Sequence, residues 1–277
     1  MRHSPRTRYR IACDHPSIAG RAEINCSPCN VARYRVFRPF TMTSVDSTSS
    51  QKTSLDEIRR RISTAAAQHE LPQLIAVSKK QSTEAIRRLA GFGQRAFGEN
   101  YVQEALTKQN ELRDLNLEWH CIGPLQSNKC REVAENFAWL QSLDRAKLIA
   151  PLLLYRPPNL PALNVLIQVN IDDETSKSGC APELIETLAA AIDASSRLRL
   201  RGLMAIPAPH ADMELRRAAF IRMRELFLAL QKNHDNIDTL SMGMSEDFEL
   251  AIAHGATMVR IGSALFGARA AHPMQGG

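Results

Sequence analysis

Two adjacent lysines, Lys79 and Lys80, directly follow the short apolar run LIAVS at residues 74–78. Such a run is typical of a buried strand, where an unpaired ammonium is strongly unfavourable. The lysines therefore lie either in water beyond the strand or at the edge of a site. Inside a site, burial or a neighbouring cation favours a neutral amine, which can condense with an aldehyde. Only one of the two lysines can point inward, and the periodicity of LIAVS does not choose between them.

A second cation, Arg260, lies within the strand-like segment at residues 257–267. Side chains alternate along a strand, so Arg260 shares a face with Gly262, and its two β-branched neighbours share the other face. The β-branched pair suits a layer of helices, which directs Arg260 inward. A buried guanidinium needs an acceptor. Two alternatives stay open: a ligand, or a structural ion pair with Glu99 or Asp172.

Two turns of small residues, GMSED and IGSALFG, follow the last two strand-like runs. Backbone N–H groups of such turns can hold a phosphate where they open a helix. Ser245 is placed to cap the following helix, and Ser263 follows Gly262, where a ligand can come close. We expect the two acidic residues of the first turn to face water.

These residue types together indicate an aldehyde that carries a phosphate. Pyridoxal 5′-phosphate (PLP) has both groups, and Arg260 would then meet the nitrogen of its ring. The alternative is a barrel aldolase that forms a Schiff base between a lysine and a sugar phosphate, with Glu99 as its acid or base.

The candidate residues are far apart in the sequence, so the fold must bring them together. From residue 51 the chain alternates helical segments with eight short apolar runs: LIAVS (74–78), RAFGEN (95–100), EWHCIGPL (118–125), AWLQSL (138–143), NVLIQVNI (164–171), LRLRGLMAIP (198–207), TLSMGM (239–244) and TMVRIGSALFG (257–267). A helix with Ser54 as its expected N-cap precedes them and has an apolar face at Leu55, Ile58 and Ile62.

Strands that alternate with helices and are apolar on both faces predict a parallel α/β sheet covered by helices. Eight such units in about 220 residues is the number that closes a (β/α)8 TIM barrel. A doubly wound open sheet is the alternative, but AVSKKQSTEA lacks the glycine-rich first turn usual there. In a closed barrel the carboxyl ends of all strands meet at one mouth. We expect there Lys79, Lys80, Glu99, Asn100, Gly123, Gln168, Asn170, Met204, Ala205, Met244, Ser245, Arg260, Gly262 and Ser263.

The net charge of +6 comes entirely from the N-terminal tail. Residues 1–42 hold eight arginines and two acidic residues, whereas the remaining chain is balanced. We therefore expect no nucleic acid as a partner of the body, and no apolar run is long enough for a membrane span. Residues 1–41 are predicted to be a disordered tail or upstream sequence read through before Met42, with a transit peptide or a nucleic-acid arm as alternatives. The barrel is predicted over residues 51–270.

The cysteines do not indicate a metal site. Cys26 and Cys29 have the spacing of half a zinc site, but no second pair follows. Cys121 and Cys130 are expected to be packed, as is His120. The scattered cysteines lack a disulfide pattern and suit a reducing cytoplasm.

Six blocks of the sequence resemble the pyridoxal phosphate homeostasis proteins, the YggS/PROSC group: AVSK (76–79), FGENYVQEA (97–105), WHCIGPLQSNK (119–129), IQVNIDDETSKSG (167–179), GLMAI (202–206) and SMGMSEDFELAIAHGATMVRIGSALFG (241–267). The resemblance spans residues 51–269. It implies a fold type III PLP-binding barrel without the C-terminal β-domain of alanine racemase.

The resemblance also implies a role for each candidate residue. Lys79 corresponds to the Schiff-base lysine, and Asn100 lies beside the cofactor ring. Arg260 bonds to the pyridine nitrogen, while the phosphate is held by Ser245, Gly262 and Ser263. Ser263 replaces the threonine common in the family, and KQST follows AVSK where the family often has a threonine and a nearby proline.

The resemblance to alanine racemase makes an enzyme the alternative function. Racemases add a β-domain with a catalytic tyrosine, whereas this chain ends about ten residues after its last strand-like run. An arginine on the ring nitrogen also weakens the ring as an electron sink. We therefore expect a non-catalytic protein of intracellular PLP (vitamin B6) homeostasis, with a racemase or decarboxylase as the alternative. Its expected partners are PLP and PLP-dependent apo-enzymes. We expect a cytoplasmic monomer.

Overall fold

The computed structural model describes residues 45–67, 70–172, 178–208 and 212–267. Contacts divide the chain into Met1–Thr41 and Met42–Gly277, and everything described below belongs to the second unit. The predictions made for residues 1–41, including those for Cys26 and Cys29, lie outside the described residues.

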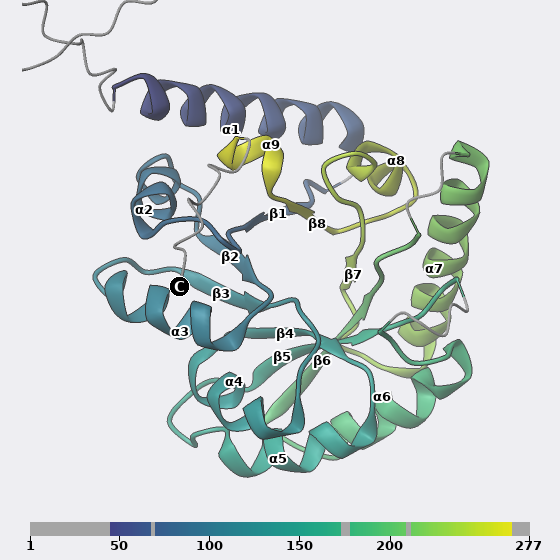
Figure 1. The fold of residues 1–277 in the computed structure, drawn as a ribbon. Coiled ribbons are helices and arrows are strands. Elements are labelled where there is room, and N and C mark those ends of the chain that lie inside the picture. The colour runs from purple at the N-terminus through teal and green to yellow at the C-terminus, as the bar shows by residue number, and fades with distance from the viewer. Residues whose placement is uncertain (1–44, 68–69, 173–177, 209–211, 268–277) are drawn as a thin grey trace, which may run out of the picture. The chain divides into compact units, whose positions relative to one another are not determined.

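Eight parallel strands form a closed barrel and follow one another in sequence order (Figure 1). This confirms the predicted (β/α)8 fold. Each strand lies within its predicted apolar run or is shifted from it by one residue: β1 Gln73–Val77, β2 Ala96–Glu99, β3 Glu118–Cys121, β4 Trp139–Leu143, β5 Leu163–Gln168, β6 Leu198–Met204, β7 Thr239–Ser241 and β8 Met258–Ile261.

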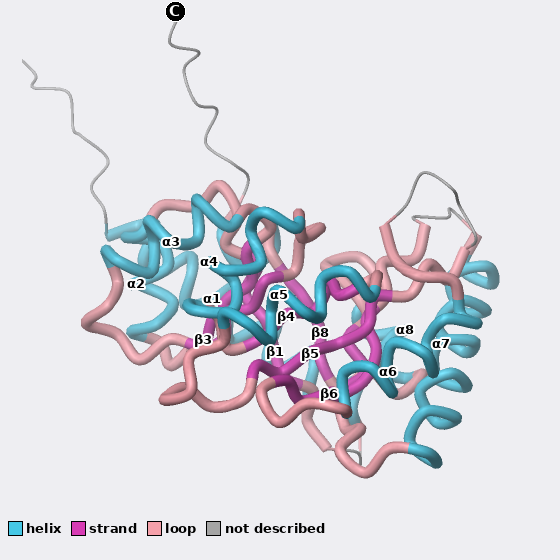
Figure 2. Tube along the Cα trace, turned by 90° about the horizontal axis from the view of Figure 1, so that it is seen from below, coloured by secondary structure: helices cyan, strands magenta, loops and turns pink. Residues whose placement is uncertain are grey.

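Helices surround the barrel (Figures 1 and 2). They are α1 Val45–Ala66, α2 Thr83–Gly91, α3 Val102–Glu111, α4 Cys130–Asn136, α5 Ile149–Tyr155, α6 Ile185–Asp193, α7 Met213–Asn233, α8 Phe248–Ala253 and α9 Ser263–Phe266, with short 3-10 turns before α4, α5 and α6 at Ser127–Lys129, Ala146–Leu148 and Pro182–Leu184. None of the described helices combines the length and apolar character that a membrane crossing requires.

The first helix begins earlier than predicted. Ser54 lies in the interior of α1 and is not its N-cap, because the helix already begins at Val45. The polar segment before Ser54 is helical, and Gln51 is buried there as the acceptor of the Arg88 Nε–H at 2.6 Å. The predicted apolar face is confirmed, since its three residues are at most 4% exposed: Leu55, Ile58 and Ile62.

Two apolar clusters show which side chains face into the barrel. The smaller cluster fills its interior and consists of Ile75, Ala96, Trp139, Leu166, Met204 and Met258. The larger one lies between the strands and the helices and includes Val259 and Ile261. Side chains of β8 therefore alternate as predicted, which places Arg260 on the inner face.

Candidate functional site

The register of β1 distinguishes the two lysines. Ile75 belongs to the interior cluster, and Lys79 continues the same alternation two residues beyond the end of the strand. Lys79 is half-buried, and its amine has no hydrogen bond or ion pair with any described residue. Lys80 is exposed, its backbone is left-handed with φ 59°, and its N–H donates to Glu104 Oε1 at 2.5 Å. The backbone thus assigns the two lysines to different environments.

Arg260 is a buried cation without a carboxylate partner among the described residues. It is 3% exposed; its Nη1 donates to Ser241 Oγ at 2.5 Å and its Nη2 to the Ala205 carbonyl at 2.8 Å. Burial lowers the pKa of Arg260 to about 10, so the guanidinium remains charged at neutral pH. The alternative of an ion pair with Glu99 or Asp172 is wrong, because Arg260 contacts neither of them.

A chain of buried polar side chains holds Arg260 from inside the barrel. Ser241 Oγ donates to Gln141 Oε1 at 2.8 Å, and Gln141 Nε2 donates to His120 Nδ1 at 2.9 Å. The His120 Nε2–H is left to donate to Glu118 Oε1 at 2.9 Å. Burial lowers the pKa of His120, which keeps the ring neutral. The sequence predicted a packed histidine but gave no sign of this chain, whose members come from four different strands.

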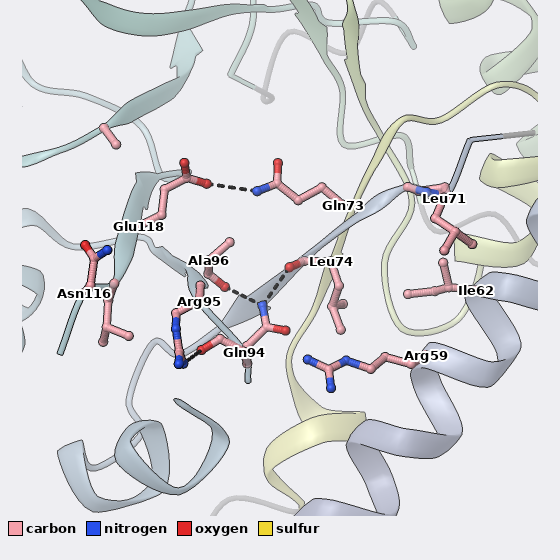
Figure 3. Close-up of a pocket in the computed structure, with 13 residues that line it drawn as sticks. Arg59, Ile62, Leu71, Gln73, Leu74, Gln94, Arg95, Ala96, Asn116 and Glu118 are labelled. Carbon is pink, nitrogen blue, oxygen red and sulfur yellow. Dashed lines mark hydrogen bonds between the residues drawn. The ribbon is translucent and has the colours of Figure 1, made fainter. Parts of the chain in front are cut away.

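A pocket lies at the opposite end of the barrel. Its volume is about 870 Å³, and the strand residues in its wall are at the beginnings of β1, β2 and β3 (Figure 3). Gln73 and Glu118 are hydrogen-bonded across it. Arg59 and Arg95 also line it, but both donate to backbone carbonyls at the end of α2. Active sites of these barrels lie at the carboxyl ends of the strands. We therefore place the candidate site at the mouth that carries Lys79 and Arg260.

Asn100 is held at the mouth by close contact with Gly123. Asn100 follows β2 on the same alternation as Ala96, whose side chain faces inward. A Cβ on Gly123 would lie only 2.2 Å from the Asn100 carbonyl oxygen. The Gly123 carbonyl is itself fixed, since it accepts from Ser142 Oγ at 2.6 Å. A glycine is therefore required at this position.

Gly123→Ala is expected to lower the free energy of unfolding by about 1–3 kcal/mol, because the new methyl group would displace the main chain at Asn100. The matched control is Gly91→Ala at the end of α2, where a Cβ meets nothing within 4 Å. This control is expected to be neutral or to stabilise the protein by up to about 1 kcal/mol. Urea unfolding followed by circular dichroism measures both, and equal midpoints for the two variants would contradict the prediction.

Ser245 lies at the mouth but does not cap a helix, which corrects the prediction. Helix α8 begins at Phe248, and Asp247 is its N-cap residue. Ser245 is half-buried in the preceding turn, where Asp247 Oδ1 accepts from the Met244 N–H at 2.7 Å. The Asp247 side chain thus stabilises the turn before α8, and no described side chain caps the helix itself.

Gly262 and Ser263 lie beside the end of β1. Strands β1 and β8 are paired, and a Cβ on Gly262 would be 3.3 Å from the Cβ of Val77. Ser263 is the first residue of α9 and is exposed. The turn after β8 is therefore next to the segment that carries Lys79.

Glu99 does not face the mouth, contrary to the prediction. It is 1% exposed and lies on the outer side of β2, where Lys108 Nζ is 2.8 Å and Ser78 Oγ is 2.6 Å from its Oε1. Burial raises the pKa of Glu99. The sequence patterns did not identify Lys108 as a partner of Glu99, although Lys108 falls on the same helical face as Val102 and Ala105. A lysine on an otherwise apolar face was the available signal.

Cys121 and Cys130 are buried, as expected. Burial raises the pKa of Cys121 to about 12, so its thiol stays protonated. No cluster of three potential metal ligands occurs among the residues that the structure describes.

Comparisons with known proteins identify relatives of this chain. Residues 53–270 match the family model described as alanine racemase, N-terminal domain. The pyridoxal phosphate homeostasis protein of Pseudomonas aeruginosa is 57% identical over 196 residues, which are 71% of this chain and 84% of the relative. The protein of the same name from Escherichia coli K12 is 50% identical over 223 residues, or 78% of this chain and 95% of the relative.

A solved structure is also similar to this chain. PipY of Synechococcus elongatus, determined with PLP bound, is 36% identical with a TM-score of 0.70. The match covers 78% of this chain and all of PipY.

Proposed function

Because the chain belongs to the family of the pyridoxal phosphate homeostasis proteins, we propose that it binds PLP at the mouth of its barrel and serves PLP homeostasis without using the cofactor in catalysis. The bound PLP of PipY supports the cofactor assignment. The observation that carries the proposal is that Arg260 lies on the inner face of β8, while Lys79 follows the paired strand β1 on the alternation of the inward-facing Ile75.

Each candidate residue has a role in this proposal. The Lys79 amine would hold PLP covalently, because the cofactor supplies an aldehyde to which a neutral amine links reversibly with loss of water. Ser245, Gly262 and Ser263 hold the phosphate through hydroxyl and backbone groups, and Asn100 lies beside the ring. PLP supplies the reactive carbonyl, and the protein supplies the amine and the fixed donors around it.

The chemistry of Arg260 fits the ring nitrogen of PLP. A guanidinium has five N–H donors, and protein acceptors bind only two of its nitrogens here. No carboxylate of the described residues forms an ion pair with Arg260, and Asp247 acts on its charge only at longer range, so the remaining N–H groups can donate to an unprotonated pyridine nitrogen. The contacts with Ser241 and Ala205 fix its orientation before any ligand arrives.

The same arginine favours a binding role over catalysis. A donor that stays charged at neutral pH keeps the ring nitrogen unprotonated, and an unprotonated ring stabilises a carbanion poorly. A racemase or decarboxylase, the alternative from the fold, would gain less carbanion stabilisation from such a ring. The aldolase alternative loses its candidate acid or base, because Glu99 is bound to Lys108 on the outer side of the barrel.

Borohydride trapping tests the proposal. The protein is reconstituted with PLP, reduced, digested and analysed by peptide mass mapping. We expect a single reduced adduct, on Lys79, since reduction makes the linkage between amine and carbonyl carbon permanent. An adduct on another residue, or none after reconstitution, would contradict the proposed site.

The protein reconstituted with PLP also serves to test whether it catalyses reactions of amino acids. It is incubated with L-alanine, L-serine and other amino acids, and products of racemisation and decarboxylation are quantified. Turnover is expected to stay far below the roughly 1 to 1000 per second of ordinary enzymes. Turnover within that range would establish the enzyme alternative.

A further inference from the structure

A buried group of charged side chains lies directly behind the turn that carries Lys79. Lys108 of α3 is 5% exposed, and Glu99 at the end of β2 is 1% exposed. We infer that Lys108 is a positioning residue, which holds this turn so that the Lys79 amine is presented at the barrel mouth. The inference rests on the proposed function, since it gives Lys108 a part in linking PLP to Lys79.

All three N–H donors of the Lys108 ammonium are hydrogen-bonded to acceptors. Its Nζ donates to the Ser78 carbonyl at 2.6 Å, to Glu99 Oε1 at 2.8 Å and to Glu104 Oε1 at 2.7 Å. An ammonium has three donors and no acceptor, so no hydrogen bond remains to be made. The Ser78 hydroxyl donates to the same Glu99 oxygen at 2.6 Å. One side chain thus joins β1, β2 and α3 at a single point.

This network fixes the main chain on both sides of Lys79. On one side, the Ser78 carbonyl is bound by Lys108. On the other side, the Lys80 N–H donates to Glu104 Oε1 at 2.5 Å, and this oxygen also accepts from Lys108. The left-handed backbone of Lys80 is uncommon outside glycine and requires such support. Between these two fixed points, the Lys79 amine has no hydrogen-bond partner among the described residues.

Simple attachment of α3 to the barrel would not require a buried charge. Val102, Ala105 and Leu112 already pack on this side, and buried ion pairs rarely stabilise a fold better than apolar residues of similar size. An ammonium with three acceptors in different directions instead defines one position for the turn. Positional precision matters for a group that must meet a carbonyl carbon, because small misplacements reduce such rates strongly.

The test compares the rates at which an aldehyde labels Lys79 and Lys80 in the full-length chain. Protein freed of bound carbonyl compounds by hydroxylamine is treated with pyridine-4-carboxaldehyde and cyanoborohydride, and mass mapping gives the labelling rates of Lys79 and Lys80. The aldehyde lacks a phosphate, so the readout does not depend on the phosphate site. In Lys108→Met the ratio of the Lys79 rate to the Lys80 rate is expected to fall on the order of tenfold. The affinity for PLP is expected to fall with it.

Arg156→Met is the matched control. Arg156 is also a buried cation, 4% exposed, but it donates to backbone carbonyls around α4 and α5, away from β1. Its loss is expected to lower stability while the labelling ratio stays at the wild-type value. An equal fall of the ratio in Arg156→Met would overturn the inference, because general loosening would then explain it.

A milder variant keeps the test usable if Lys108→Met does not fold. Glu104→Gln weakens the contacts to Lys108 and to the Lys80 N–H at a partly exposed position, and a severalfold fall of the ratio is expected. If the labelling ratio of Lys79 to Lys80 is unchanged in either folded variant while the wild-type chain binds PLP, the inference about Lys108 is wrong and the proposed function is unaffected. Failure of the wild-type chain to bind PLP would overturn the proposed function, and the role in PLP linkage with it.

Discussion

Lys79→Ala is expected to abolish the absorption band of the Schiff base in the protein reconstituted with PLP, whereas Lys80→Ala should retain this band. The reason is that a Schiff base requires the amine of the residue whose backbone continues the inward alternation of β1. Lys80 is exposed on a left-handed backbone and provides the matched control one residue away. Absorption spectra and the mass of the borohydride-reduced protein measure both variants.

Binding of PLP to Lys79→Ala should be weakened but not lost. The phosphate and ring contacts of the other site residues remain, so only the covalent contribution disappears. A rise of the dissociation constant on the order of 100-fold corresponds to roughly 2.7 kcal/mol. Loss of colour in Lys80→Ala together with retained colour in Lys79→Ala would reverse the assignment.

Arg260→Ala is expected to raise the dissociation constant for PLP by about 10- to 100-fold, which is the usual contribution of a hydrogen bond from a charged donor. The absorption band should also shift, because the ring nitrogen loses its donor. The barrel is expected to remain folded in far-UV circular dichroism, at reduced stability, since Ser241 and Ala205 lose their partner. Titration with PLP followed by absorbance measures the affinity and the shift together.

Two variants separate the role of the guanidinium from general effects of its burial. Ser241→Ala removes the side chain that orients Arg260 and should give a smaller change in the same direction. Arg156→Ala removes another buried arginine and should lower stability without changing the PLP spectrum. If Arg260→Ala leaves affinity and spectrum unchanged, the arginine has only a structural role.

Local patterns predicted the framework of this protein well. The eight strands lie where the apolar runs were found, and Arg260 lies on the inner face because its β-branched neighbours mark the outer one. Alternation along a strand is a property of the backbone itself, so a few residues are enough to detect it. The candidate site was found in the same way, since the ends of parallel strands must meet at one mouth.

Predictions that depended on a partner from another element were less successful. Glu99 was placed at the mouth because it ends a strand-like run, but its buried partner on α3 lies nine residues further along the chain. Ser245 was taken as a helix cap, and Asp247 makes the turn's side-chain contact with the main chain instead. In each case a second side chain decided the outcome, and no periodicity contains that information.

The sequence by itself determined the number of strands, the closed barrel and the residue types expected of a PLP site, because periodicity and strand order are local properties of the chain. The resemblance had assigned the Schiff base to Lys79, whereas only the tertiary structure showed the different environments of Lys79 and Lys80 and how Arg260 is held. Those outcomes depend on contacts that join β1 to α3 and β8 to β7, β4 and β3 through the barrel interior. Such contacts exist only after the barrel has closed.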